Sequence, residues 1–126
     1  MAGRYDITIY QGSRFELPFT IKNSNGTAFD LTGYLARGQI RRHMRSTGTP
    51  TATFTCTIAT PATGEIISAL THTQTGGITA GDTVTDPRSK YVYDIEIYKP
   101  VTPPALETVV RRILEGYAYI DPEVTR

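Results

Sequence analysis

The sequence predicts an all-β fold, an antiparallel sandwich of about seven or eight short strands. Three observations lead to this prediction. Apolar and polar residues alternate over several short runs, and turn-forming residues separate these runs. Threonine, tyrosine, isoleucine and valine are frequent, and these side chains fit a pleated strand better than a helix.

The alternation of apolar and polar residues locates the strands. Strands are expected at Ile7–Ile9, Phe15–Ile21, Tyr34–Arg42, Thr51–Ile58 and Tyr91–Ile97. The apolar window Leu106–Leu114 predicts a last strand, with a bulge at Glu115-Gly116 because glycine tolerates the backbone of a bulge. Pro18 has no backbone N–H, so its strand is expected at a sheet edge.

Turn-forming residues separate these strands. Asn23–Gly26 contains Asn-Gly, which supplies the positive φ angles of a tight turn. The Asp30 carboxylate is placed to accept from the backbone two residues further on, as in an Asx turn. Thr73–Asp86 holds three glycines and little periodicity, so a loop or one short turn of helix is expected. Pro100–Pro104 predicts a stiff connection between the last two long strands.

Length, charge and cysteine content limit the classes of function. The 126 residues are expected to form one domain, 1–126, around a single core. A net charge of +1 gives no electrostatic reason to expect a nucleic acid or an anionic membrane as partner. Cys56 is the only cysteine, which excludes an internal disulfide and favours intracellular folding. No signal peptide and no run of membrane-spanning length is expected.

The sequence has no pattern typical of a catalytic, cofactor-binding or metal site. A Gly-x-Ser-x-Gly elbow, a phosphate-binding loop and clustered Cys and His residues are all missing. His43 and His72 stand apart, and Cys56 lies on the apolar parity of its strand, as a small core residue would. Asp94 and Glu96 share a polar parity and are interpreted as solvated residues. No enzyme activity, cofactor or metal is therefore predicted.

Arginine and tyrosine supply the candidate interface residues. Ten arginines outnumber three lysines, and arginine is enriched at protein interfaces. A local cluster comprises Arg37, Arg41, Arg42 and Arg45. A protein interface or a solvated face is favoured over nucleic acid, because only Tyr34 lies near enough to stack on bases. Tyr117 and Tyr119 alternate with Ala118 and Ile120, so this tyrosine pair faces either a partner or the core.

Four segments stand out by their order and spacing. They read YDITIYQGSRF from Tyr5, DLTGYLAR from Asp30, KYVYDIEI from Lys90, and RILEGY with IDPEVTR from Arg112 onward. Together they resemble a family of small virion proteins of tailed bacteriophages, over nearly the full chain. That family is similar to the immunoglobulin-like N-terminal domain of phage baseplate upper proteins, which attaches a receptor-binding or fibre module to the tail.

The resemblance implies an immunoglobulin-like β-sandwich and a non-enzymatic structural role in the virion, as a tail, baseplate or fibre-attachment adaptor. The implied partners are other virion proteins and copies of the chain, and the chain would be made in the host cytoplasm. A chain that ends at Pro122–Arg126 is expected to lack a receptor-binding domain, which favours an adaptor over an adhesin. Thr73–Ser89 and Pro100–Pro104 depart from the family pattern, and Thr73–Ser89 is a second expected contact surface.

Two alternative functions stay open. A β-sandwich serves equally well in a capsid decoration or head–tail connector protein, because a fold does not define a function. A carbohydrate-binding module for a host surface glycan is the other alternative. It would need exposed aromatic rings on one face, and the candidates are Tyr98, Tyr117 and Tyr119.

Overall fold

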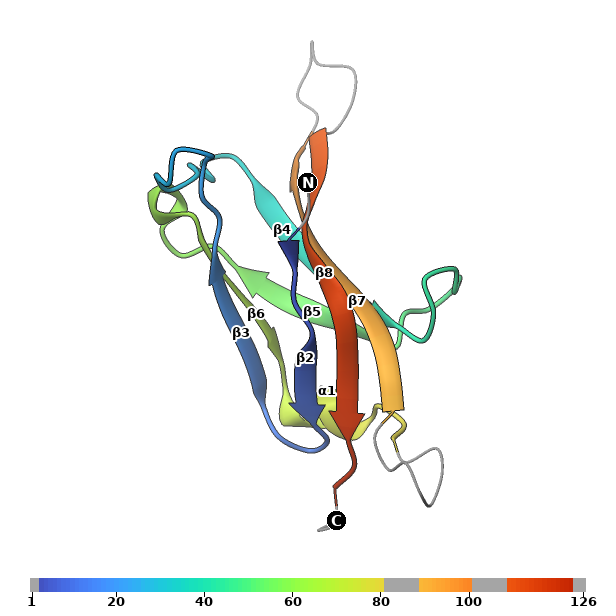
Figure 1. The fold of residues 1–126 in the computed structure, drawn as a ribbon. Helices are drawn as coiled ribbons and strands as arrows, with labels where there is room; N and C mark the ends of the chain where they lie inside the picture. The colour runs from blue at the N-terminus through green and yellow to red at the C-terminus, as the bar shows by residue number, and fades with distance from the viewer. Residues whose placement is uncertain (1–2, 81–88, 101–108, 124–126) are drawn as a thin grey trace.

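The computed structural model describes residues 3–80, 89–100 and 109–123, without the side chain of Val109, and this part is nearly all β (Figure 1). The strands are β1 (Gly3–Arg4), β2 (Ile7–Tyr10), β3 (Phe15–Thr20), β4 (Leu35–Arg41), β5 (Ala52–Thr57), β6 (Glu65–Leu70), β7 (Ser89–Lys99) and β8 (Val109–Asp121). A 3₁₀ turn, η1 (Pro61–Thr63), precedes β6, and a short helix, α1 (His72–Gly76), follows it. The all-β prediction is confirmed.

The strands follow one hydrogen-bonded path, β1-β8-β7-β4-β5-β6-β3, with β2 also paired to β8. The path curls because β5 changes partner along its length. Ala52–Phe54 pair with β4, whereas Thr55–Thr57 pair with β6. The β3–β6 pair consequently lies opposite the layer of β2, β8, β7 and β4 (Figure 1). Strand β3 ends the path, so Pro18 lies on an edge strand as predicted.

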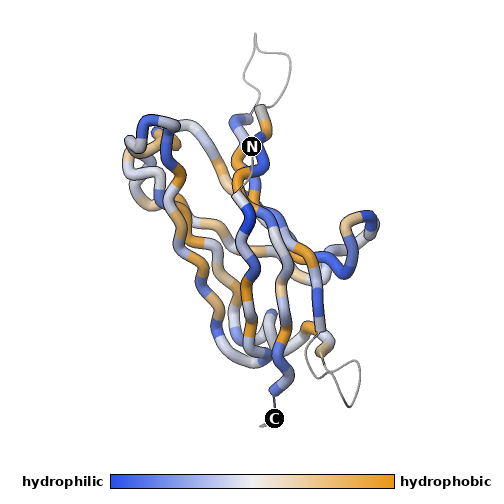
Figure 2. Tube along the Cα trace, in the orientation of Figure 1, coloured by the Kyte–Doolittle hydropathy of each residue, from blue (hydrophilic) through white to orange (hydrophobic). Residues whose placement is uncertain are grey.

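The apolar parity of the strands fills the space that the curled sheet encloses, and Figure 2 shows apolar and polar residues alternating along the strands. The central core comprises Ile7, Ile9, Ile40, Ala52, Phe54, Leu70, Ile78, Tyr91, Tyr93, Ile95, Ala118 and Ile120. Phe15, Leu17 and Phe19 of β3 pack against it, as their alternation predicts. Burial of this apolar surface is the main favourable contribution to folding.

Both N-terminal strands pair parallel with β8, so the sheet is mixed. The expectation of an antiparallel arrangement throughout is therefore wrong. Gly116 permits this pairing, because a Cβ there would lie 2.1 Å from the Tyr5 carbonyl oxygen. The Tyr93 hydroxyl donates to that carbonyl from the core, and the Asp6 carboxylate accepts from the Tyr117 N–H at 3.0 Å. Burial raises the pKa of Tyr93, which keeps its hydroxyl protonated as a donor.

Gln11, in the turn between β2 and β3, connects three segments of the chain. Its backbone N–H donates to the Asp121 carbonyl at 3.0 Å, and its side-chain oxygen accepts from the Glu123 N–H at 2.9 Å. Its side-chain nitrogen donates to the Ile78 carbonyl at 2.8 Å. The tyrosine-rich N-terminal motif and the C-terminal motif therefore lie side by side and hold the two ends of the chain together.

The Asp30 turn prediction is confirmed, and the Asn-Gly prediction is confirmed in part, because Gly26 has a positive φ and Asn25 does not. Gly26 has a φ of +88°, and its N–H donates to the Asn23 carbonyl at 2.9 Å. Asp30 Oδ1 accepts from the hydroxyl and the N–H of Thr32, at 2.6 and 3.0 Å. These two hydrogen bonds favour the carboxylate and lower the pKa of Asp30.

The structure corrects the predicted position of the bulge. The register of the β7–β8 pair shifts between Ile95 and Glu96, opposite Ile113, and it is regular at Glu115-Gly116. Strand β6 was not predicted. Helix α1 begins with a capping box at Thr71, just before Thr73–Asp86, and overlaps the start of that stretch, where a loop or a turn of helix was expected. Residues 81–88 of that stretch, and 101–104 of the expected proline connection, lie outside the described residues.

Candidate binding face and its pocket

One face of β4, β7 and β8 turns away from the core and carries the candidate site. We call it the outer face. It consists of Leu35, Arg37, Gln39, Arg41, Lys90, Val92, Asp94, Glu96, Tyr98, Val110, Arg112, Glu115, Tyr117 and Tyr119. The register of the three strands aligns these side chains in rows that run across the sheet.

The first ionic row consists of Arg37, Glu96 and Arg112, which the register places side by side. The Arg37 guanidinium forms an ion pair with the Glu96 carboxylate. The same guanidinium lies over the ring of Tyr98, 4.4 Å from its centroid, which is a cation–π contact. Glu96 and Tyr98 therefore hold the Arg37 side chain flat against the sheet.

The second ionic row consists of Gln39, Asp94 and Glu115. Two carboxylates directly opposite each other on paired strands repel. Arg112 offsets this repulsion, because its guanidinium lies 3.2 Å from Asp94 and 3.3 Å from Glu115. Arg112 thus links the two ionic rows into one network.

Asp94 is the most perturbed carboxyl group of the outer face. Its partial burial raises its pKa, and the charges of Glu96 and Glu115 act in the same direction. Arg112 and Arg41 lower the pKa, but burial has the larger effect. The carboxyl group of Asp94 thus gains a proton more readily than an ordinary aspartate.

An apolar row adjoins the first ionic row. The register places Leu35, Tyr98 and Val110 side by side across β4, β7 and β8. Leu35 is 50% exposed and Val110 is 45% exposed, so both are exposed large apolar side chains. Aliphatic and aromatic side chains left in contact with water beside arginines are typical of protein-binding surfaces.

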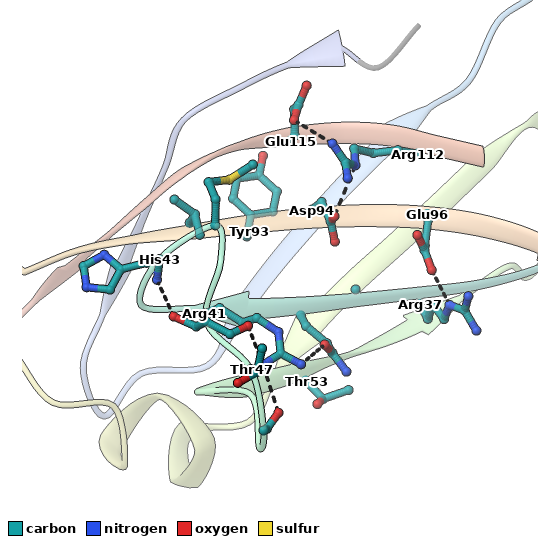
Figure 3. Close-up of a pocket in the computed structure, with 16 residues that line it drawn as sticks. Arg37, Arg41, His43, Thr47, Thr53, Tyr93, Asp94, Glu96, Arg112 and Glu115 are labelled. Carbon is teal, nitrogen blue, oxygen red and sulfur yellow. Dashed lines mark hydrogen bonds and ion pairs between the residues drawn. The ribbon is translucent and has the colours of Figure 1, made fainter. Parts of the chain in front are cut away.

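The loop that connects β4 and β5 stands beside the ionic rows and forms one side of a pocket (Figure 3). The Arg41 guanidinium donates to the Gly48 carbonyl at 2.9 Å, to the Ser46 carbonyl at 3.5 Å and to Gln39 Oε1 at 3.1 Å. Within the loop, His43 and Ser46 exchange two hydrogen bonds, each close to 3 Å. Arg41 therefore fastens the loop to the sheet.

Loop and sheet enclose a half-open pocket with a volume of about 660 Å³ (Figure 3). Its charged lining consists of three guanidiniums and three carboxylates, those of Arg37, Arg41, Arg112, Asp94, Glu96 and Glu115. Met44, which is 70% exposed, and Val92 add an apolar contribution. The pocket is thus polar, close to neutral and partly apolar at its rim.

The structure divides the predicted arginine cluster. Arg37 and Arg41 share the outer face, as their spacing on one strand predicts, and both line the pocket. Arg42 turns the other way: its guanidinium lies 4.8 Å from the centroid of the Tyr91 ring and donates to the Lys90 carbonyl at 2.8 Å. Arg45 is exposed in the loop between β4 and β5 and does not line the pocket.

Burial decides the orientation of the predicted tyrosine pair. Ala118 and Ile120 are fully buried, so Tyr117 and Tyr119 point outward from the same face as Arg37 and Arg41. Their ring centroids lie 6.2 Å apart. The Nζ of the exposed Lys90 lies 4.6 Å from the centroid of the Tyr117 ring, which is a cation–π contact on the outer side of the sheet. Two of the candidate arginines and both tyrosines therefore share one surface.

The remaining sequence candidates lie elsewhere. Cys56 is half-buried, with its Sγ 3.3 Å from Ser68 Oγ, and burial raises the pKa of its thiol. His72 is exposed at the first residue of α1. His43 lines the pocket, whereas Cys56 and His72 do not. Within residues 3–80, 89–100 and 109–123, no group of three His, Cys, Asp or Glu residues is placed to hold a metal ion.

Sequence reasoning missed several residues of this face, namely Arg112, Glu115, Leu35 and Val110. The alternation in β7 placed Asp94, Glu96 and Tyr98 on one parity, but their neighbours depend on the pairing of β4, β7 and β8. That pairing is set by contacts distant in sequence.

No protein-family model matches this chain, and no curated protein matches it significantly. The resemblance to phage virion proteins therefore depends on the short motifs alone. In the part of the chain that the structure describes, no helix is long and apolar enough to span a membrane.

Proposed function

We propose that this protein is a non-enzymatic structural subunit of a bacteriophage virion, a tail, baseplate or fibre-attachment adaptor that binds a neighbouring subunit through its outer face. One observation carries the proposal of a binding face: the exposed apolar row of Leu35, Tyr98 and Val110 lies directly beside two ionic rows. The placement of the protein in a phage particle comes from the resemblance of its four sequence motifs.

The composition of the outer face suits a protein partner. Tyrosine, arginine and methionine are enriched at interfaces, and tyrosine and arginine dominate the few residues that contribute most binding energy. Leu35 and Tyr98 offer apolar surface that a partner would bury, whereas Arg37 and Glu96 would fix the orientation of that partner. Ion pairs already formed within the face lower the cost of ordering these side chains on binding.

The strand pairing supports the finer description of the fold as an immunoglobulin-like sandwich. If β3 is equated with strand B, then β3–β6–β5 follows the order B–E–D, and β4–β7–β8 follows the order C–F–G. The switch of β5 from β4 to β6 joins the two layers. In this description the outer face is the exposed side of the C–F–G layer.

Charge reversal on the outer face tests the proposal. The double variant Arg37→Glu/Arg112→Glu places new carboxylates beside Asp94, Glu96 and Glu115, so its folding is checked first by circular dichroism. We expect the folded double variant to be lost from assembled particles. Arg14→Glu is the matched control, because Arg14 is an exposed arginine next to Glu16, at the start of the edge strand β3 and away from the outer face. Particles produced with each variant would be purified and the amount of incorporated chain measured by immunoblot. Normal incorporation of the folded double variant would contradict the proposal.

A further inference from the structure

We infer that the pocket between the β4–β5 loop and the outer face is a binding site for a neutral saccharide ring. This inference does not rest on the virion role, since the pocket is a property of the single chain. Arg37 and Glu96 belong to both the pocket and the proposed subunit contact, so a saccharide and a subunit would compete for this part of the outer face. It also differs from a glycan site on the tyrosine pair, because Tyr117 and Tyr119 do not line the pocket.

The charges that line the pocket disfavour an ionic ligand. Three guanidiniums face three carboxylates, so the pocket has no net charge from these groups. A phosphate would meet the carboxylates of Asp94 and Glu115, which lie directly opposite each other on paired strands. A cation would meet Arg112, which lies within 3.3 Å of both. A charged ligand of either sign is attracted by one set of side chains and repelled by the other. A neutral ligand avoids this repulsion.

The hydrogen-bonding groups of the pocket match a ring with several hydroxyl groups. The ion pairs engage Oδ2 of Asp94, Oε1 of Glu96 and Oε2 of Glu115, one oxygen of each carboxylate. A carboxylate accepts several hydrogen bonds and a guanidinium donates five, so both kinds of group retain capacity. Each sugar hydroxyl donates and accepts, and neighbouring hydroxyls match the paired oxygens and paired N–H groups of such side chains.

The wall of the pocket is positioned before any ligand arrives. Arg41 holds the loop through the carbonyls of Ser46 and Gly48, so binding does not have to order this segment. Met44 and Val92 supply apolar surface for the C–H groups of a sugar ring. The volume of about 660 Å³ lies within the range of small-molecule pockets, about 300–1,000 Å³.

An NMR titration of the full chain tests this site. The probes are methyl glucoside, methyl galactoside, methyl mannoside and N-acetylglucosamine, with inorganic phosphate as an anionic comparison. We expect saturable shifts at the backbone amides of 43–48, Thr53 and Asp94 with at least one sugar, and no competition by phosphate. Glu115→Gln should weaken that binding by about tenfold, because it replaces one acceptor oxygen with a donor.

Two further variants separate the outcomes. Met44→Ser should weaken the same titration, and because Met44 is 70% exposed this change leaves the fold intact. Glu16→Gln, a matched carboxylate change on β3, should have no effect. The inference is overturned if no sugar gives saturable shifts at these amides, if phosphate competes, or if Tyr119→Ala abolishes binding while Glu115→Gln does not.

Discussion

Gly116 is a residue at which the backbones of the N-terminal and C-terminal segments lie in close contact. The Tyr5 carbonyl lies above it, receives the Tyr93 hydroxyl, and leaves no room for a side chain. A glycine inside a strand normally weakens that strand, but here it permits the backbone of a neighbouring strand to pack against it. The parallel docking of the N-terminal strands therefore depends on this one position.

The first prediction concerns Gly116→Ala. The new Cβ would lie 2.1 Å from the Tyr5 oxygen, so the N-terminal strands must shift away from β8. We expect the free energy of unfolding to fall by about 1–3 kcal/mol, as for overpacked cores. Gly3→Ala is the control, because its Cβ would lie 3.6 Å from the nearest atom, an ordinary contact. Urea unfolding measures both, and equal stabilities for the two variants would contradict the steric explanation.

The second prediction concerns the titration of Asp94. Burial raises its pKa, so the folded protein holds this proton more tightly than the unfolded chain. The stabilising contribution of Asp94 is therefore fully present below its ordinary pKa of 3.8, and it is lost as the pH rises through the folded pKa. The stability of the wild type relative to Asp94→Asn should accordingly decrease from acid to neutral pH in urea unfolding.

Asp30 provides a comparison of opposite sign for this titration. The hydroxyl and N–H of Thr32 lower its pKa, so its contribution is present above 3.8 and is lost as the pH falls through the folded pKa. The stability of the wild type relative to Asp30→Asn should therefore increase over the same pH range. Parallel pH trends for the two variants would show that the assigned causes are incorrect.

At the scale of elements, the loop between β4 and β5 determines whether the outer face has a pocket. The Arg41 side chain, at the end of β4, holds this loop in place by donating to the backbone carbonyls of Ser46 and Gly48. The guanidinium links Gln39 on the sheet to the loop carbonyls. The loop thus acts as a fixed wall because one strand residue binds its backbone.

The third prediction follows from this contact. Arg41→Met keeps an apolar stem but removes the donors, so residues 43–48 should show larger amplitudes of backbone motion and faster amide exchange. Arg45→Met is the matched control, since Arg45 lies exposed in the same loop. ¹⁵N relaxation and hydrogen exchange measure both variants. Unchanged dynamics in Arg41→Met would mean that the loop is held by other contacts.

Most strands could be predicted because one parity of each is apolar, as in Phe15, Leu17 and Phe19 of β3. Strand β6 was missed because its alternation is broken: Ser68 is buried, whereas Ile67 on the other parity is partly exposed. Residues 3 and 4 gave no signal for β1, whose pairing depends on the distant Leu114 and Glu115. The rows of the outer face could not be predicted from the sequence either, because the register between strands determines which residues are neighbours across the sheet.

At the scale of the whole molecule, the fold joins its two ends on one layer and presents the outer face on the far side of that layer. The N-terminal strands add to β8, and Gln11 ties the C-terminal segment at Glu123 to the turn after β2. Strand β7 lies at the centre, between β4 and β8, with its inner parity in the core and its outer parity in the ionic rows. Strand β7 therefore holds the side chains of the proposed contact surface in register with those of β4 and β8.

The proposed virion role is tested most directly by quantitative mass spectrometry of density-purified virus particles from the source of this chain, with tails separated from heads. We predict that the chain is present in the tail fraction in a fixed stoichiometric ratio to a known tail subunit. Its recovery with heads would contradict the adaptor role and favour a decoration or connector protein. Its absence from the particles would contradict the virion role altogether.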